Sequence, residues 1–173
     1  LEAPVLGSIP QAKEGKLIVM VGGAKELFEQ FKTLFEAFGP EPLYIGQVGK
    51  ASALKLAFNQ LIATLTAAFS LSLGIVQKEN IEVEQFMSIL RKSALYAKTF
   101  DVKLNNMLND NFSSVNFPAK HLLKDINLTL NMTDDLKIDS TVLQAVAKIL
   151  EKTLDLGNAE KDYSVLYDSV VTK

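Results

Sequence analysis

A stripe of polar side chains along one otherwise apolar helix contains the residues best suited to chemistry. Its members recur at three-, four- and seven-residue steps and so share one face: Ser52, Lys55, Asn59, Thr66 and Ser70. Lys55 is the only cation in the stripe, and burial lowers a lysine pKa toward the range useful for proton transfer. Asn59, one turn further on, could orient Lys55 or hold a substrate oxygen. Spacing alone also allows a Lys55 side chain that simply extends into water from an amphipathic helix. Of the two interpretations, spacing alone favours this second one.

The helix that carries this stripe is predicted from about residue 49 to residue 77. It has no charged residue from Leu56 to Gln77, which is about the length of a membrane-spanning helix of roughly 20 residues. Six polar residues interrupt the run: Asn59, Gln60, Thr64, Thr66, Ser70 and Ser72. We therefore expect a helix buried among other helices and no membrane partner. Covering it needs additional helices, which predicts a homodimer or a higher homo-oligomer.

The rest of the chain divides into a short mixed region and a long helical one. Strand-like runs are predicted at residues 3–6, 17–21 and 43–45, with a helix from Lys25 whose core would include four phenylalanines: Phe28, Phe31, Phe35 and Phe38. After residue 49 the pattern is helical, with further helices predicted at 81–90, 94–108, 119–132, 140–156 and 159–171. Ser140 is a plausible N-cap, and Gly157 a plausible C′ residue.

Composition excludes several classes of function. The chain has no cysteine and one histidine, so neither a disulfide framework nor a zinc centre is expected, and we predict no metal site. Its 18 Lys and Arg residues against 20 Asp and Glu give a net charge of −2 without a basic cluster, so we expect no nucleic-acid partner. The lack of cysteine is compatible with a reducing cytoplasm, the expected location.

Three segments in order resemble the β-hydroxyacid dehydrogenase family, which has a 6-phosphogluconate dehydrogenase-like C-terminal domain. Gly46-Gln47-Val48-Gly49 with Lys55 and Asn59 is similar to the signature G-x-x-G-x5-K-x3-N. The segment at residues 3–8, Ala-Pro-Val-Leu-Gly-Ser, looks like the family's substrate-binding A-P-V-S-G-G. The segment at residues 120–125, Lys-His-Leu-Leu-Lys-Asp, looks like the K-x-x-x-K-D helix that meets the nicotinamide end of the cofactor. Phe117-Pro118 is most similar to the glyoxylate and succinic semialdehyde reductase branch.

The resemblance implies a role for each matching residue. Lys55 would be the catalytic acid/base, and Lys124 would help to bind the NADP or NAD cofactor. A small oxo or hydroxy acid would be contacted by Gly7, Ser8, Asn59, Phe117 and Asp125. The implied fold is mainly α: an all-helical substrate-binding and dimerisation domain with a long central helix over residues 49–173. The last β-α-β portion of a truncated Rossmann domain would precede it over residues 1–48.

Two departures from the family pattern qualify this function. Leu6 replaces the family serine that helps to hold the substrate carboxylate, so the anion would depend on the backbone N–H groups of Gly7 and Ser8 and on the Ser8 hydroxyl. No G-x-G-x-x-G follows a strand, so we expect the chain to begin partway through the Rossmann domain and to be inactive alone. Two alternatives stay open: a 3-hydroxyisobutyrate or tartronate semialdehyde dehydrogenase, and a non-catalytic helical dimerisation module.

Overall fold

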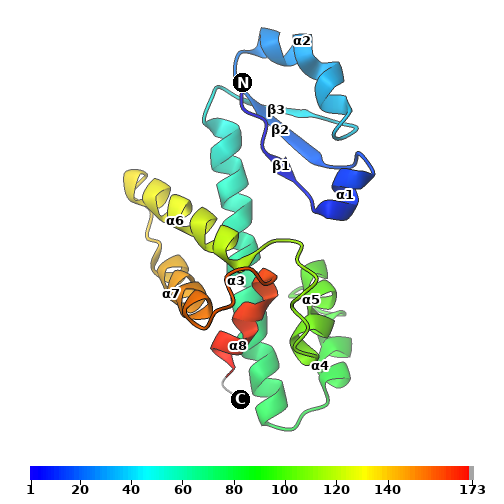
Figure 1. Ribbon diagram of the computed structural model, residues 1–173, viewed down its shortest axis with the longest axis vertical. Helices are drawn as coiled ribbons and strands as arrows, with labels where there is room; N and C mark the ends of the chain where they lie inside the picture. Colours follow the sequence, from blue (N-terminus) through cyan, green and yellow to red (C-terminus); the bar gives the residue numbers. More distant parts are fainter. Residues whose placement is uncertain (172–173) are drawn as a thin grey trace. The chain divides into compact units, whose positions relative to one another are not determined.

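The computed structural model describes residues 1–171, which form two compact units, Leu1–Asn59 and Gln60–Lys173. One helix, α3 (Lys50–Lys78), contributes its first ten residues to unit 1 and the rest to unit 2. The sequence pattern changes where α3 begins, after residue 48, whereas the contacts divide the chain inside this helix. Figure 1 shows the strands and α2 of unit 1 and the helices of unit 2.

Unit 1 contains a three-stranded sheet with the order β1-β2-β3 (Figure 1). Strand β1 (Val5–Leu6) pairs antiparallel with β2 (Ile18–Gly22), and β2 pairs parallel with β3 (Leu43–Gly46). Helix α2 (Lys25–Glu36) connects the two parallel strands. This β2-α2-β3 unit confirms the β-α-β portion expected from the alternating strand and helix patterns.

The core of unit 1 lies between α2 and the sheet. Phe28 and Phe35 are buried there with Val19 and Val21 of β2. The prediction that Phe31 and Phe38 are also core was wrong, since 40% and 51% of these residues are exposed. A sheet of three short strands covers only one stripe of a helix, and the neighbouring apolar stripe of α2 lies outside that contact.

A short helix, α1 (Ile9–Lys13), was not predicted. It follows Gly7 and Ser8 directly and precedes β2, with Ser8 at its N-cap and Pro10 in its first turn. Five residues are too few for a hydrophobic period to be visible, so only the cap and the proline could have indicated it.

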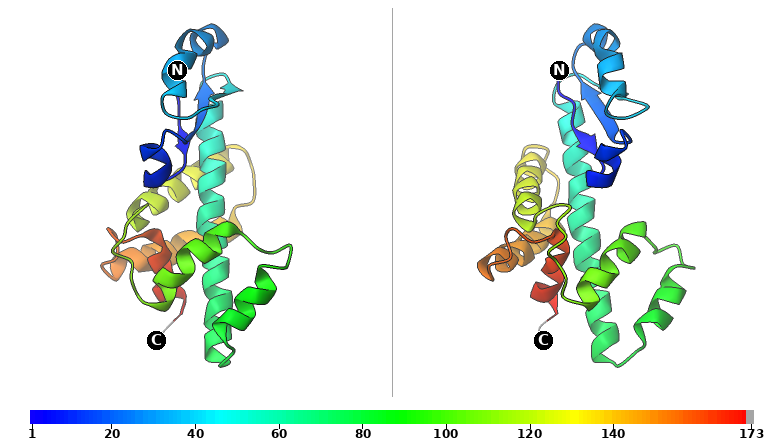
Figure 2. Two further views of the ribbon diagram at one scale, coloured as in Figure 1. Left: turned by 90° about the vertical axis from the view of Figure 1, so that its right-hand side faces the viewer. Right: turned by 45° about the vertical axis from the view of Figure 1, so that its right-hand side comes forward.

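Unit 2 is helical and is built around residues 60–78 of α3. Helices α6 (Ala119–Asp135) and α7 (Thr141–Asp155) form one apolar cluster with Ala63 and Ala67 of α3. Helices α4 (Val83–Leu90) and α5 (Lys98–Leu108) form a second cluster with Phe69 and Leu73. Figures 1 and 2 show these two helix pairs on different sides of α3. The all-helical domain with a long central helix is therefore confirmed.

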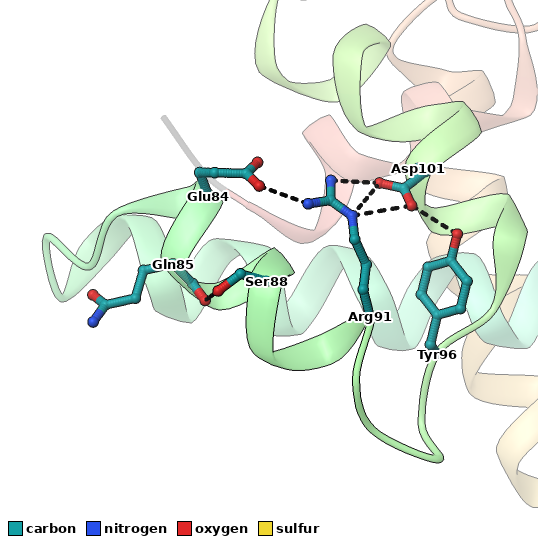
Figure 3. A network of polar contacts seen from close by, with 6 residues as sticks. All are labelled: Glu84, Gln85, Ser88, Arg91, Tyr96 and Asp101. Atoms are coloured by element: carbon teal, nitrogen blue, oxygen red, sulfur yellow. Dashed lines mark hydrogen bonds and ion pairs between the residues drawn. The ribbon is translucent and has the colours of Figure 1, made fainter.

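Helix α5 begins four residues later than predicted, because residues 91–97 form a loop closed by a polar cluster (Figure 3). The Arg91 guanidinium donates to both carboxylate oxygens of Asp101 and to Glu84, and the Tyr96 hydroxyl donates to Asp101. The hydrogen bonds from Arg91 hold the pKa of Asp101 below its ordinary value. The same carboxylate raises the pKa of Tyr96 through the hydrogen bond between them.

The predicted C-terminal helix over residues 159–171 is shorter in the structure. It consists of a 3-10 turn, η1 (Tyr163–Val165), followed by α8 (Leu166–Val170). Residues 159–161 form a turn and a bend instead, and Asp162 forms an isolated antiparallel bridge with Pro118 while the Tyr163 N–H donates to the Phe117 carbonyl.

Helix α3 is the one described helix that is long and apolar enough to cross a membrane by length and composition. The core helix of a soluble protein meets the same criterion, so this is weak evidence for a membrane. Small and hydroxyl side chains of α3 are buried within unit 2, among them Ala63, Thr66 and Ser70. This packing agrees with a helix covered by other helices.

Candidate functional site

Lys55 and Asn59 lie one turn apart on the same face of α3, inside unit 1. Lys55 is half-buried, and Asn59 is almost completely buried, with 2% of its surface exposed. A buried amide in a long apolar helix is costly unless it is bonded, so a polar group at this position indicates a specific role. The half-burial of Lys55 argues against a side chain that merely extends into water.

Further along the stripe, the hydroxyl groups bond to their own helix. Thr66 Oγ1 donates to the Ile62 carbonyl at 2.7 Å, and Ser70 Oγ donates to the Thr66 carbonyl at 2.8 Å. Both residues are buried in unit 2, and these bonds satisfy their hydroxyl protons locally. The polar stripe therefore has two parts. The part near Lys55 carries groups suited to chemistry, and the hydroxyl groups near Ser70 have a structural role.

The turn at Gly7 and Ser8 follows β1 in unit 1. Gly7 has a φ of +139°, and a Cβ atom there would lie 2.7 Å from Leu17 Cδ2, so only glycine fits. The Ser8 N–H donates to Gln11 Oε1 at 3.0 Å and is therefore already engaged. Within residues 1–171, by contrast, the buried Ser8 hydroxyl oxygen has no hydrogen-bond partner. An anion at this turn would thus be held by the Ser8 hydroxyl rather than by the Ser8 N–H.

Glu2, which the sequence reasoning missed, binds the N-terminus of α3. Its Oε1 atom accepts hydrogen bonds from the backbone N–H groups of Gly49, Ala51 and Ser52 at 2.8, 3.0 and 3.3 Å. Its Oε2 atom accepts from the Ser52 hydroxyl at 2.6 Å. That last bond is the largest cause of a pKa below the ordinary value for Glu2, and the three N–H groups add to it. An acidic residue 47 or more positions away gives no local capping signal.

The other predicted residues lie at the start of α6 in unit 2. Phe117 precedes the N-cap Pro118, is half-buried, and packs edge-on against the Tyr163 ring with centroids 6.1 Å apart. Lys124 is exposed and pairs with the mostly buried Asp125 at 2.7 Å. Beside them, α6 borders a hollow of about 380 Å³ lined by Lys120, Leu123, Lys124, Asn127, Leu128 and Asn131.

A buried ion pair close in structure to Phe117 was not predicted from the sequence either. Lys103 Nζ lies 2.8 and 2.9 Å from the two carboxylate oxygens of Asp162, with both side chains almost fully buried. The same carboxylate accepts from the Ser164 N–H, the Ser164 hydroxyl and the Asn116 N–H. Asp162 thus fixes the backbone next to Phe117. The sequence gives no indication that a lysine in one predicted helix pairs with an aspartate 59 residues away.

Tyr163 completes this network within unit 2. Lys103 Nζ lies 4.6 Å from the centre of its ring. Burial raises the pKa of the Tyr163 phenol above its ordinary value.

The structure groups the predicted residues by unit. Unit 1 holds Gly7, Ser8, Lys55 and Asn59, and unit 2 holds Phe117, Lys124 and Asp125. Within residues 1–171 no group of three or more His, Asp or Glu side chains is arranged to hold a metal ion.

Comparisons with known proteins match nearly the whole chain. Residues 49–170 match the family model described as NAD-binding of NADP-dependent 3-hydroxyisobutyrate dehydrogenase. Residues 1–46 match the NAD binding domain of 6-phosphogluconate dehydrogenase. Glyoxylate/succinic semialdehyde reductase 1 of Arabidopsis thaliana is 31% identical over 170 residues, which are 98% of this chain and 58% of that protein.

The chain is also similar to a nuclear factor and to a dehydrogenase of known structure. Cytokine-like nuclear factor N-PAC of Aedes aegypti is 28% identical over 96% of this chain and 30% of its own length. The crystal structure of 3-hydroxyisobutyrate dehydrogenase from Salmonella typhimurium shares the fold with a TM-score of 0.86 at 17% identity, over 96% of this chain and 58% of that one. The chain therefore spans little more than half of the reductase and the dehydrogenase. From the family model over residues 49–170 we conclude that it belongs to the β-hydroxyacid dehydrogenase family.

Proposed function

We propose that this chain is the substrate side of an NAD(P)-dependent β-hydroxyacid dehydrogenase that reduces a small oxo acid, such as glyoxylate or succinic semialdehyde. The observation that carries the proposal is the pair Lys55 and Asn59, one turn apart on α3 in unit 1, the first half-buried and the second buried. The names of the Arabidopsis relative and of the matching family models support the same reaction class.

In the proposed reaction, Lys55 supplies the proton. A bound nicotinamide would provide hydride to the carbonyl carbon, and negative charge would then develop on the carbonyl oxygen. The Lys55 ammonium group donates its proton to that oxygen, and the Asn59 amide holds the oxygen by a hydrogen bond. In the reverse direction, neutral Lys55 removes the proton from the hydroxy acid.

The substrate carboxylate is assigned to the turn after β1. The buried Ser8 hydroxyl has no partner among the described residues, and so it is available to donate to an anion. The Gly7 position, where a side chain would meet Leu17, keeps the turn compact. The half-buried Leu6 side chain adds bulk where the family has a serine, which favours a small substrate.

The cofactor is assigned in part to α6. The exposed Lys124 ammonium and the amides of Asn127 and Asn131 line the hollow on this helix and are suitable donors for ribose hydroxyl or phosphate oxygens. The sequence has no glycine-rich phosphate-binding turn after a strand, so no residue of this chain is assigned to the two linked phosphates of the nucleotide.

A second copy of this chain is the proposed macromolecular partner. One stripe of α3 in unit 2 alternates three- and four-residue steps through Leu61, Thr64, Ala68, Leu71 and Ile75. Leu61, Leu71 and Ile75 are 46%, 58% and 55% exposed. This spacing is that of a helix seam that packs against a like helix, which supports a homodimer or a higher homo-oligomer.

Two other functions keep specific support. The names of the Salmonella dehydrogenase and of the family model favour 3-hydroxyisobutyrate as an alternative substrate, and tartronate semialdehyde belongs to the same chemistry. One relative is named as a nuclear factor and not as a dehydrogenase, which leaves a non-catalytic role as the second alternative. A panel of these oxo and hydroxy acids separates the first alternative, and absence of turnover on all of them favours the second.

The test of the main proposal is Lys55→Ala in a full-length protein that includes a nucleotide-binding half. Because the proton donor is lost while the cofactor site stays, kcat should fall by roughly 10²- to 10⁴-fold with little change in the KM for NADPH. Lys55→Arg should not rescue, since guanidinium hardly releases its proton near neutral pH. Lys50→Ala, at an exposed lysine of the same helix, is the matched control. Retention of most of kcat by Lys55→Ala would refute the assignment.

A further inference from the structure

Glu2 connects two segments that the proposed chemistry needs at a fixed separation. Its backbone pairs with β2, where the Glu2 N–H donates to the Gly22 carbonyl and the Gly22 N–H donates to the Glu2 carbonyl, at 2.9 and 3.0 Å. Its side chain receives four hydrogen bonds from the start of α3. One residue therefore bonds to the sheet through its main chain and to the helix of Lys55 through its carboxylate.

The path of the Glu2 side chain depends on Gly22. A Cβ atom at residue 22 would collide with Glu2 Oε1 and would lie 3.0 Å from Glu2 Cγ. Gly22 lies at the end of β2, and its neighbouring position in β3 is Gly46, directly before the turn into α3. The absence of a side chain at Gly22 thus leaves the space through which the carboxylate reaches α3.

The distance in sequence distinguishes Glu2 from an ordinary helix cap. Asp139 caps α7 from two residues away, accepting from the Thr141 N–H at 2.9 Å and from the Thr141 hydroxyl at 2.6 Å. Such a local cap moves with its own helix. Glu2 lies 47 to 50 residues from the groups that it binds, so its bonds fix α3 to another part of unit 1.

We propose that Glu2 is a positioning residue that fixes Lys55 relative to the Gly7–Ser8 turn; this inference rests on the proposed function. The Gly7–Ser8 turn follows Glu2 by five residues along a segment paired with β2 at Val5 and Leu6. Lys55 follows Ser52, the last residue bound by Glu2, by less than one helical turn. The proton donor is thus close to the Glu2 carboxylate, and the carboxylate-binding turn is close to the Glu2 main chain.

The experiment compares Glu2→Ala with Asp139→Ala in the full-length enzyme, with kcat, the KM for the oxo acid and for NADPH, and Tm measured for each. Misplacement of a catalytic group by about 1 Å can lower the rate on the order of 10²-fold, so Glu2→Ala should lower kcat roughly 10- to 100-fold. The KM for NADPH should not change. Glu2→Gln keeps an oxygen that accepts the N–H bonds and should restore most of kcat. Asp139→Ala should lower Tm but leave kcat unchanged.

Each result decides between positioning and simple capping. If Glu2→Ala lowers Tm as Asp139→Ala does and leaves kcat intact, Glu2 is only a cap and the inference is refuted. Should Glu2→Ala fail to fold, Ser52→Ala removes only the hydroxyl bond to Glu2, and a partial loss of kcat is expected while an unchanged kcat overturns the inference. Lys55→Ala is assayed in parallel: if it stays active, the proposed function has failed, whereas an inactive Lys55→Ala beside a fully active Glu2→Ala refutes the Glu2 inference alone.

Discussion

Each of the two units is organised by one carboxylate, and the two carboxylates work under opposite conditions. Glu2 in unit 1 is partly exposed and binds three backbone N–H groups and a hydroxyl. Asp162 in unit 2 is fully buried and binds a lysine, a hydroxyl and two N–H groups. Both join segments that are distant in the sequence.

Similar bonding therefore has different consequences in water and in a protein interior. Water screens the Glu2 charge, so its bonds contribute little to stability, and their main effect is on geometry. The Asp162 charge is removed from water, so loss of its partner leaves a charge that nothing replaces. Unit 2 should therefore depend on its carboxylate for folding and unit 1 for activity.

The largest effect is expected from Lys103→Met, which leaves Asp162 buried without its cation. Breaking a buried ion pair typically costs about 3–5 kcal/mol, and unfolding in urea should show a loss of that size. The double variant Lys103→Met/Asp162→Asn removes the orphaned charge and should lose less. Lys120→Met removes the exposed partner of Glu160 and serves as the control, with an expected loss of about 0–1 kcal/mol. If Lys103→Met and Lys120→Met lower the free energy of unfolding equally, the proposed difference between buried and exposed carboxylates is refuted.

A smaller effect is expected on self-association, which we propose to occur through the exposed stripe of α3 in unit 2. Leu71→Asp puts a charge into the exposed α3 stripe, and the dimer dissociation constant should rise by about 10-fold or more. Val142→Asp on α7, where 68% of the residue is exposed, is the control. Sedimentation equilibrium measures both. A dimer that is unaffected by Leu71→Asp would exclude this stripe as the interface.

The smallest effect concerns pH and sharpens the description of Glu2. Its pKa is below the ordinary 4.5, so its stabilising contribution is complete above pH 4.5 and is lost as the pH falls through the lower folded value. The stability difference between the native chain and Glu2→Gln should therefore shrink below pH 4.5. The pKa values of Asp101 and Asp139 are also lowered. Both residues are present in both proteins, so their pH-dependent contributions to stability cancel in the difference. A difference that stays constant from pH 6 to pH 3 would show that the Glu2 charge contributes nothing.

Much of the fold could be predicted because hydrophobic periodicity reports burial directly. The long helix was predicted at residues 49–77 and is observed as Lys50–Lys78, and Gly157 lies just past α7 with a φ of +80°, as expected of a C′ residue. The errors come from contacts that periodicity does not encode. Arg91 and Asp101 delay the start of α5, and the turn before Asp162 with its bridge to Pro118 takes the place of the first turns of the predicted last helix.

The candidate site could be predicted where motif residues stand close in sequence, as Lys55 and Asn59 do on α3. The groups that support them could not. Glu2, Lys103 and Asp162 act through partners 47 to 59 residues away, and no residue type reveals its partner at such a distance. The hydrogen bond from the Ser8 N–H to the Gln11 side chain could not be predicted either, because Gln11 belongs to α1, which was not predicted.

The Arg91 cluster and the Lys103–Asp162 pair also differ in the chain entropy that each requires. The bond from Arg91 to Asp101 closes a loop of 10 residues, and the bond from Lys103 to Asp162 closes one of 59. Loop-closure entropy grows only logarithmically, so the longer loop costs roughly 1.6 kcal/mol more to close. That is less than the expected cost of breaking the buried pair. The Lys103–Asp162 pair can thus offset the closure of its long loop by itself, while the α4–α5 loop closes with little loss of chain freedom.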